Sequence, residues 1–123
     1  MNLAMKSALL LILAAGSAAA APTTVVEGTG GPMLTNADGM TLYTFDKDAE
    51  GVSNCVDECA ALWPVFAADE DDQAEGDYAM IERDDGTRQW TYKGMPLYTF
   101  AKDAAAGDAT GDGVKDVWHI ARP

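Results

Sequence analysis

The amino-acid sequence predicts a mostly β fold, a small antiparallel sheet or sandwich with a pseudo-twofold internal repeat and one short helix near residues 55–62. Two observations carry this prediction. The decapeptide GMTLYTFDKD at residues 39–48 returns as GMPLYTFAKD at residues 94–103, with eight of ten positions identical. Trp63 then returns at the same later distance as Trp118. The two halves are therefore predicted to be structural equivalents.

The first twenty residues have the pattern of a secretory signal peptide. One positive charge, Lys6, precedes an apolar stretch at residues 8–15 and a run of small residues at 16–21. We expect cleavage after Ala20, which leaves a single domain at residues 21–123 and a periplasmic or secreted location. The apolar stretch is too short to span a bilayer, and no cysteine stands at the cleavage site to take a lipid. No membrane span and no lipid anchor are expected.

The charge of the mature chain limits its partners. Loss of Lys6 leaves seven basic residues against twenty acidic ones, a net charge of −13. Such a surface repels nucleic acid and anionic lipid, so we expect neither as a partner. A cationic partner or a metal ion would be attracted. The sequence leaves the partner open between an envelope protein and a small ligand.

The first repeat, at about residues 30–68, predicts a turn, a strand and a helix in that order. Residues 36–39 form the turn, and Gly39 can take the positive φ that it needs. In the strand that follows, Leu42 and Tyr43 point to opposite faces, and both faces should be covered. Asn54 is a candidate N-cap of the helix, which ends before Pro64.

An acidic linker at residues 69–77 joins this repeat to the second one, at about residues 77–123. Six acids among nine residues repel one another and resist packing, so a loop is expected there. The second repeat should begin with a hairpin made of residues 78–82 and 87–92, with a turn at 84–86. Pro96 cannot donate a ladder hydrogen bond, which places its strand at a sheet edge.

The duplicated pattern G-x-x-L-Y-x-F-x-x-D resembles the secreted-repeat family of predicted bacterial lipoproteins, which is named for its Y-x-(F/W/Y)-x-x-D motif. The segments C-x-x-x-C-A-x-x-W-P at residues 55–64 and QWTYKG at residues 89–94 are similar to it as well. The resemblance covers nearly the whole mature chain. It implies an envelope-associated protein of unknown function and brings no catalytic residues with it.

The duplicated residues themselves are better explained by structure than by catalysis. A pseudo-symmetric domain needs the same packing residues twice, and an aspartate that ends a strand motif can accept backbone N–H groups in a turn. The motif residues are Tyr43, Phe45 and Asp48 in the first copy and Tyr98, Phe100 and Asp103 in the second.

Cys55 and Cys59 are the only cysteines, and an even count in an exported domain predicts a disulfide. A bridge over four positions fits a helix poorly, so the helix should be distorted there. The alternative is thiol redox chemistry or copper binding, because thiolates are soft ligands for Cu(I) and His119 could complete a site. His119 itself lies in a predicted terminal strand.

A weak calcium loop is the remaining candidate site. Asp108, Thr110, Asp112 and Asp116 supply oxygen atoms at alternate positions around a glycine. The position of the closing bidentate glutamate is taken by His119, which favours an ordinary solvated turn. No cofactor is expected, with copper and calcium as the alternatives. The sequence therefore predicts an exported, non-enzymatic binding or interaction module, with periplasmic copper handling or thiol redox through Cys55 and Cys59 as the alternative.

Overall fold

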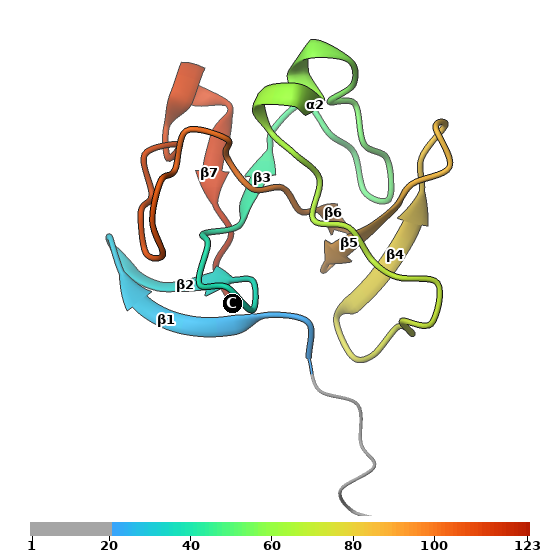
Figure 1. The fold of residues 1–123 in the computed structure, drawn as a ribbon, viewed down its shortest axis with the longest axis horizontal. Coiled ribbons are helices and arrows are strands. Elements are labelled where there is room, and N and C mark those ends of the chain that lie inside the picture. The colour runs from blue at the N-terminus through green and yellow to red at the C-terminus, as the bar shows by residue number, and fades with distance from the viewer. Residues whose placement is uncertain (1–20) are drawn as a thin grey trace, which may run out of the picture.

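The computed structural model describes residues 21–123, so the predicted signal peptide lies outside the described residues. Three small antiparallel sheets form the fold, which confirms the predicted class (Figure 1). One sheet pairs β1 with β2, a second pairs β3 with β7, and a third has the order β4-β5-β6. The strands are β1 (Thr24–Gly28), β2 (Gly31–Thr35), β3 (Tyr43–Phe45), β4 (Tyr78–Glu82), β5 (Arg88–Tyr92), β6 (Met95–Pro96) and β7 (Trp118–Ile120), and the helices are α2 (Glu58–Leu62) and the 3₁₀ turn η2 (Val114–Asp116).

The first repeat begins with a hairpin that the sequence patterns did not reveal. Strands β1 and β2 pair from Thr24↔Thr35 to Gly28↔Gly31, around a turn in which Gly30 has φ 77°. This hairpin corresponds to the β4–β5 hairpin of the second repeat, which was predicted correctly. Each repeat therefore begins with a hairpin before its duplicated strand.

The turn that follows β5 shows how the second copy of the motif is introduced. Lys93 and Gly94 both have positive φ, 51° and 86°, as the two central residues of a tight hairpin turn require. Strand β6 follows at once and lies at the edge of its sheet, with Pro96 opposite Thr91. The predicted edge position of Pro96 is confirmed.

The helix is shorter than the sequence indicated, and its predicted N-cap is wrong. Asp57, not Asn54, occupies the cap position, with φ 56° and no side-chain hydrogen bond to the helix. The positive φ of Asp57 changes the chain direction before the helix, so α2 begins only at Glu58. Asn54 instead donates its side-chain N–H to the carbonyl of Lys47 at 2.7 Å. The predicted distortion near the cysteines is thus a complete break.

Two apolar clusters lie on opposite faces of the duplicated strands, as the alternation predicted. Leu42 and Leu97 are fully buried in one cluster, together with Leu34, Trp90 and Ala121. Tyr43 and Tyr98 are fully buried in the other. That second cluster contains Met33, Tyr43, Phe45, Cys55, Trp63, Tyr98, Phe100, Trp118 and Ile120. Each repeat supplies residues to both clusters.

Candidate functional site

The duplicated tyrosine and aspartate of each repeat bond to those of the other repeat. The Tyr43 hydroxyl donates to Asp103 Oδ2 at 2.6 Å, and the Tyr98 hydroxyl donates to Asp48 Oδ2 at 2.6 Å. Each aspartate is also held within its own repeat, since Asn54 N–H donates to Asp48 and Thr110 N–H donates to Asp103. The duplicated tyrosines and aspartates therefore join the two repeats.

The phenylalanine of the motif in each repeat also packs against a tryptophan of the other repeat. Phe45 stacks on Trp118 with ring centroids 4.2 Å apart, and Phe100 stacks on Trp63 at 4.0 Å. The two tryptophans stack on each other at 3.8 Å with an interplanar angle of 3°. The result is a continuous stack of four rings in which the repeats alternate in reciprocal pairs. Burial of this kind marks these residues as packing residues, as the duplication suggested.

Burial also shifts the pKa of the tyrosine hydroxyls and of the Asp48 carboxyl in these bridges. It raises the pKa of the Tyr43 and Tyr98 hydroxyls, and the bound aspartates raise it further, so that both remain protonated donors. Burial raises the pKa of the Asp48 carboxyl above its usual value of 3.8, while hydrogen bonds from Tyr98 and Asn54 and the charge of Arg83 oppose the rise. Neither tyrosine is thus placed to act as a base.

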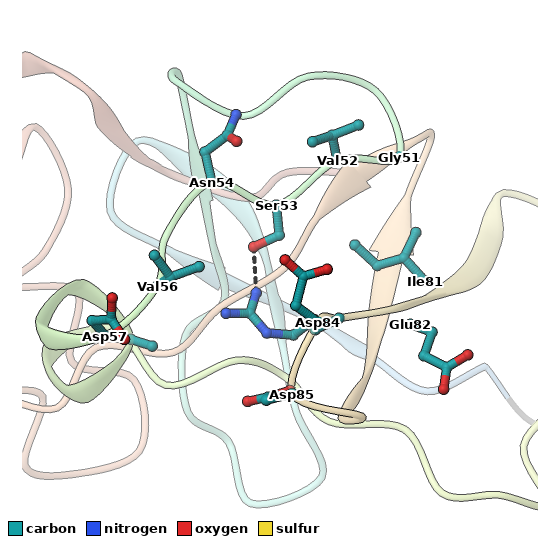
Figure 2. A pocket seen from close by; sticks show the side chains of 12 residues that line it. Gly51, Val52, Ser53, Asn54, Val56, Asp57, Ile81, Glu82, Asp84 and Asp85 are labelled. Atoms are coloured by element: carbon teal, nitrogen blue, oxygen red, sulfur yellow. Dashed lines mark hydrogen bonds between the residues drawn. The ribbon is translucent and has the colours of Figure 1, made fainter.

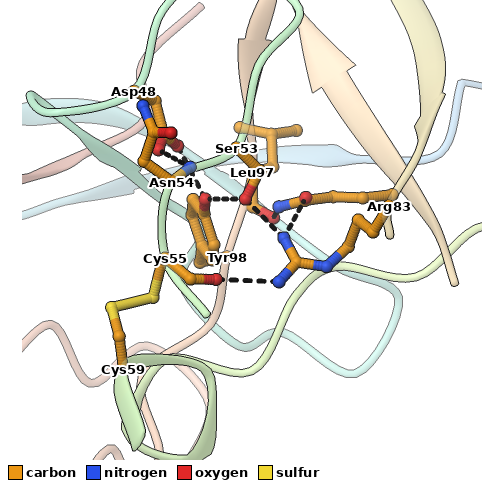
Figure 3. Close-up of a disulfide and its surroundings, with 9 residues drawn as sticks. Asp48, Ser53, Asn54, Cys55, Cys59, Arg83, Leu97 and Tyr98 are labelled. Carbon is orange, nitrogen blue, oxygen red and sulfur yellow. Dashed lines mark hydrogen bonds between the residues drawn. A yellow bond between two sulfur atoms is a disulfide. The ribbon is translucent and has the colours of Figure 1, made fainter. Parts of the chain in front are cut away.

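The two halves differ beside the Tyr98–Asp48 bridge, where the second repeat contributes a polar network (Figure 3). Arg83 donates from Nη1 to Ser53 Oγ and to Gln89 Oε1, and from Nη2 to the Cys55 carbonyl at 2.8 Å. Ser53 in turn bonds the Tyr98 hydroxyl at 2.6 Å. Because the Tyr98 hydroxyl donates to Asp48, it accepts from Ser53, and Ser53 accepts from Arg83. The hydrogen bonds therefore form a chain in which each group donates to the next, from Arg83 to the Asp48 carboxylate.

The first repeat fills the equivalent space with apolar atoms. Superposing the hairpins places Gly28 at the position of Arg83 and Met33 at the position of Gln89. Met33 is almost fully buried, and a Cβ at Gly28 would overlap its Cε methyl group. The first repeat therefore has a closed apolar core at this point, whereas the second repeat has the guanidinium of Arg83. Sequence reasoning missed Arg83, although the Gly28-to-Arg83 difference between the aligned repeats was a visible signal.

The disulfide between Cys55 and Cys59 lies against this network, and it is present as the sequence predicted. Cys55 is fully buried and Cys59 partly so. The Cα atoms lie 5.2 Å apart, and Asp57, which has a positive φ, stands between them in the chain. The bridge thus fixes the segment whose Cys55 carbonyl receives Arg83.

An open pocket with a volume of about 550 Å³, which Arg83 helps to line, lies between the segment that leads into α2 and the β4–β5 turn (Figure 2). We call it the Arg83 pocket. Its lining combines aliphatic side chains with carboxylates and consists of Gly51, Val52, Ser53, Asn54, Val56, Asp57, Ala60, Ile81, Glu82, Arg83, Asp84 and Asp85.

The lining has an unusual combination of exposed apolar surface and negative charge. Val52 and Val56 are 49% and 51% exposed, which is high for large aliphatic residues. Asp57, Glu82, Asp84 and Asp85 line the same pocket, against the single positive charge of Arg83. Hydrogen bonds from Thr87 hold the pKa of the Asp85 carboxyl below its usual range, so its charge persists in mildly acidic solution. The lining therefore combines a net negative charge with exposed apolar surface.

Most of the other predicted site residues form hydrogen bonds with neighbouring protein groups. His119 lies on the exposed side of β7, where its Nε2 is 2.8 Å from Asp46 Oδ2. The Asp108 carboxylate accepts the N–H groups of Ala104 and Ala105, while Asp112 accepts that of Ile120.

Thr110 bonds Asp103, and Asp116 lies in η2 with φ 60°. Within residues 21–123 no three His, Cys, Asp or Glu side chains are close enough to hold a metal ion. The same part of the chain contains no helix that is long and apolar enough to cross a membrane.

A family model described as a secreted repeat of unknown function matches the chain twice, at residues 24–67 and 79–122. The two matches begin at the corresponding hairpin strands β1 and β4 and end at the segments that follow α2 and β7. No curated protein and no solved structure matches the chain. Because the matches span most of the sequence, the chain belongs to this family of secreted repeats.

Proposed function

We propose that this secreted-repeat protein is a non-enzymatic binding module of the cell envelope, and that the Arg83 pocket docks a basic peptide segment of a partner protein. The observation that carries the proposal is the lining of that pocket. Two exposed valines and four carboxylates line it beside Arg83, where the second repeat departs from the apolar packing of the first. The duplicated tyrosines and aspartates are committed to holding the repeats together, which leaves this face for recognition.

The chemistry of the pocket selects the partner. A lysine or arginine can approach Glu82 and Asp84 at the rim, while an adjacent aliphatic side chain covers Val52 and Val56. A pocket of about 550 Å³ is large enough for two or three side chains of a peptide. The strongly acidic composition draws such a segment to the surface from a distance. The predicted signal peptide supports a periplasmic or secreted location for this encounter.

The proposal is tested with an acetylated peptide that alternates lysine and valine, titrated into protein labelled with ¹⁵N. We expect the largest amide shifts at residues 51–60 and 81–85. The variant Glu82→Lys/Asp84→Lys should weaken binding at least tenfold. The control Glu70→Lys/Glu75→Lys makes the same change in net charge at exposed acids outside the pocket, and it should retain most of the affinity.

Equal weakening by both variants would mean that only the overall charge attracts the peptide. Shifts produced equally well by a glutamate–valine peptide would contradict recognition of a cation. Shifts produced by a small amine alone, with no gain from the peptide, would assign the pocket to a small ligand instead.

The alternative that the sequence offered, copper handling or thiol redox, requires the Cys55–Cys59 bridge to be reduced, because Cu(I) binds thiolates. Its test is a Cu(I) titration of the reduced protein against a competing chelator, with Cys55→Ser/Cys59→Ser as the comparison. Thiol-dependent binding with His119 among the shifted residues would favour that function over peptide docking.

A further inference from the structure

The two repeats exchange their final segments, and the exchange is reciprocal. Phe66, at the end of the first repeat, accepts from Trp90 N–H at 2.9 Å and donates to the Leu97 carbonyl at 2.9 Å. Ala121, at the end of the second repeat, accepts from Leu34 N–H at 2.9 Å and donates to the Leu42 carbonyl at 2.8 Å. Each repeat therefore lacks its own last strand segment and receives that of its neighbour.

The side chains follow the same rule as the backbone. Both tyrosine–aspartate bridges and both phenylalanine–tryptophan stacks join residues of different repeats, as described above. These bridges and stacks are related in pairs by the pseudo-twofold axis, whereas the further bonds of the two hydroxyls, Ser53 with Tyr98 and Gly111 N–H to Tyr43, differ between the halves. A surface built in this way is complementary to a second copy of its partner, whichever chain supplies that copy.

The connection between the repeats is the acidic linker, residues 69–77, and eight of its nine residues are exposed. The linker keeps the partner repeat at a high effective concentration, of the order of millimolar, so that pairing within one chain normally prevails over pairing between chains. Nothing in the exchanged contacts themselves requires the two repeats to belong to the same chain.

We propose that two copies of this chain can exchange repeats and form a dimer in which every tyrosine–aspartate bridge joins different chains. The length of the linker decides between the monomer and this dimer. Ala67 faces Gln89 on one side of β5, and Tyr78 faces Tyr92 on the other. Ala68 donates its N–H to the Arg88 carbonyl, so from Ala68 to Tyr78 the linker crosses two strand spacings and four residues of β5, a separation of roughly 16 Å.

The test removes residues 70–76, which leaves three Cα–Cα steps between Ala68 and Tyr78. Three steps span at most about 11 Å, so the native pairing within one chain cannot form. We expect the deletion variant to have twice the monomer mass in light scattering and to retain the wild-type circular dichroism spectrum. A matched control, in which residues 70–76 are replaced by seven glycine and serine residues, should remain a monomer. A deletion variant that is folded and monomeric would overturn the proposal.

A pair of introduced cysteines locates the contact. Thr44 and His119 are directly opposed in the β3–β7 pair, which joins the first repeat to the second. With Thr44→Cys/His119→Cys, oxidation should produce a covalent dimer in the deletion variant and a cross-link within one chain in the linker control. Peptide mapping should identify the 44–119 bond in both.

A second experiment covers the case in which the deletion variant does not fold. Thr44→Cys and His119→Cys chains with the full linker are mixed, unfolded in denaturant with the native disulfide intact, and refolded together at about millimolar concentration. The proposal predicts a 44–119 cross-link between chains that falls at least tenfold when refolding takes place at about micromolar concentration. Absence of that cross-link at the high concentration would overturn the proposal.

Discussion

Tyr43 and Tyr98 bond to each other through their backbones in both directions, with Tyr43 N–H donating to the Tyr98 carbonyl at 2.7 Å and Tyr98 N–H donating to the Tyr43 carbonyl at 3.0 Å. This pair lies at the centre of the pseudo-twofold arrangement. From it the two side chains extend to opposite repeats, where each hydroxyl meets the aspartate of the other copy. The pair therefore explains why tyrosine and aspartate are duplicated together.

The first prediction is that Tyr43 is energetically coupled to Asp103, in the other repeat, and not to Asp48 in its own. Tyr43→Phe should lower the free energy of unfolding by roughly 1–3 kcal/mol, because a buried carboxylate loses a donor. Combined with Asp103→Asn it should give a coupling energy of about 1 kcal/mol or more in urea unfolding, whereas combination with Asp48→Asn should be nearly additive.

The mirror-image cycle is the control for this prediction. Tyr98→Phe should couple with Asp48→Asn and not with Asp103→Asn. Tyr92→Phe, a half-buried ring outside both bridges, should cost less than either. Coupling of each tyrosine to the aspartate of its own copy would show that the bridges do not cross between the repeats in solution.

The second prediction concerns the pH dependence of stability at Asp48. Because the pKa of its carboxyl is raised in the folded state, the folded protein holds this proton more tightly than the unfolded chain. Its contribution is therefore most favourable below the usual value of 3.8 and is lost as pH rises through the folded-state pKa.

Asp48→Asn does not titrate at this position, so the variant serves as the reference. The unfolding free energy of Asp48→Asn minus that of the wild type should increase as pH rises from about 3 to 7, and then level off. Urea titrations at five or six pH values measure the difference directly. A difference that decreases with pH would mean that the bonds from Tyr98 and Asn54 outweigh the cost of burial.

The sequence predicted the strands of the duplicated motif, the β4–β5 hairpin, the edge position of Pro96 and the disulfide, because each depends on neighbours along the chain. It did not predict which repeat completes which bridge. The spacing of Tyr43 and Asp48 is the same whether a tyrosine meets the aspartate of its own copy or that of the other, so periodicity carries no information on that choice. The β1–β2 hairpin was missed because Thr24–Gly28 exposes most of its residues and shows little alternation.

The candidate site was harder to predict than the fold. The residues that indicated a site were cysteine, histidine and the acids of one loop, whereas the network depends on Arg83, which belongs to no motif, and on Gln89, whose QWTYKG segment indicated only the family resemblance. Their importance follows from what replaces them in the first repeat, Gly28 and Met33. Only the one-residue offset between the two hairpins, visible in the structure, aligns Met33 with Gln89.

The third prediction is that the disulfide stabilises a local segment more than the whole fold. A bridge that closes so short a loop contributes about 2 kcal/mol on chain-entropy grounds, so Cys55→Ala/Cys59→Ala should remain folded. Amide exchange should accelerate at residues 53–62. It should also accelerate at Arg83, because the Cys55 carbonyl that accepts from its guanidinium is no longer held in place.

Exchange in the β3–β7 pair should be almost unchanged in that variant, and this pair is the internal control. Chemical reduction of the wild-type protein should reproduce the pattern. Faster exchange across the entire chain, in proportion to a global loss of stability, would show that the bridge holds the whole fold and would contradict a local role.

The last prediction uses Gly111, which lies under the aromatic stack. A Cβ at this position would be 2.7 Å from Cη2 of Trp63 and 3.0 Å from Cδ2 of Phe100, so Gly111→Ala must displace one of these rings. Both are buried among other rings, and overpacking of this kind costs about 1–3 kcal/mol. The near-ultraviolet circular dichroism of the stacked tryptophans should change with it.

Gly107→Ala is the matched control, because Gly107 has φ 87° and no atom within 4 Å of the added methyl. It should cost stability through backbone strain alone and leave the aromatic spectrum intact. An unchanged spectrum in Gly111→Ala would mean that the four rings do not form a continuous stack in solution.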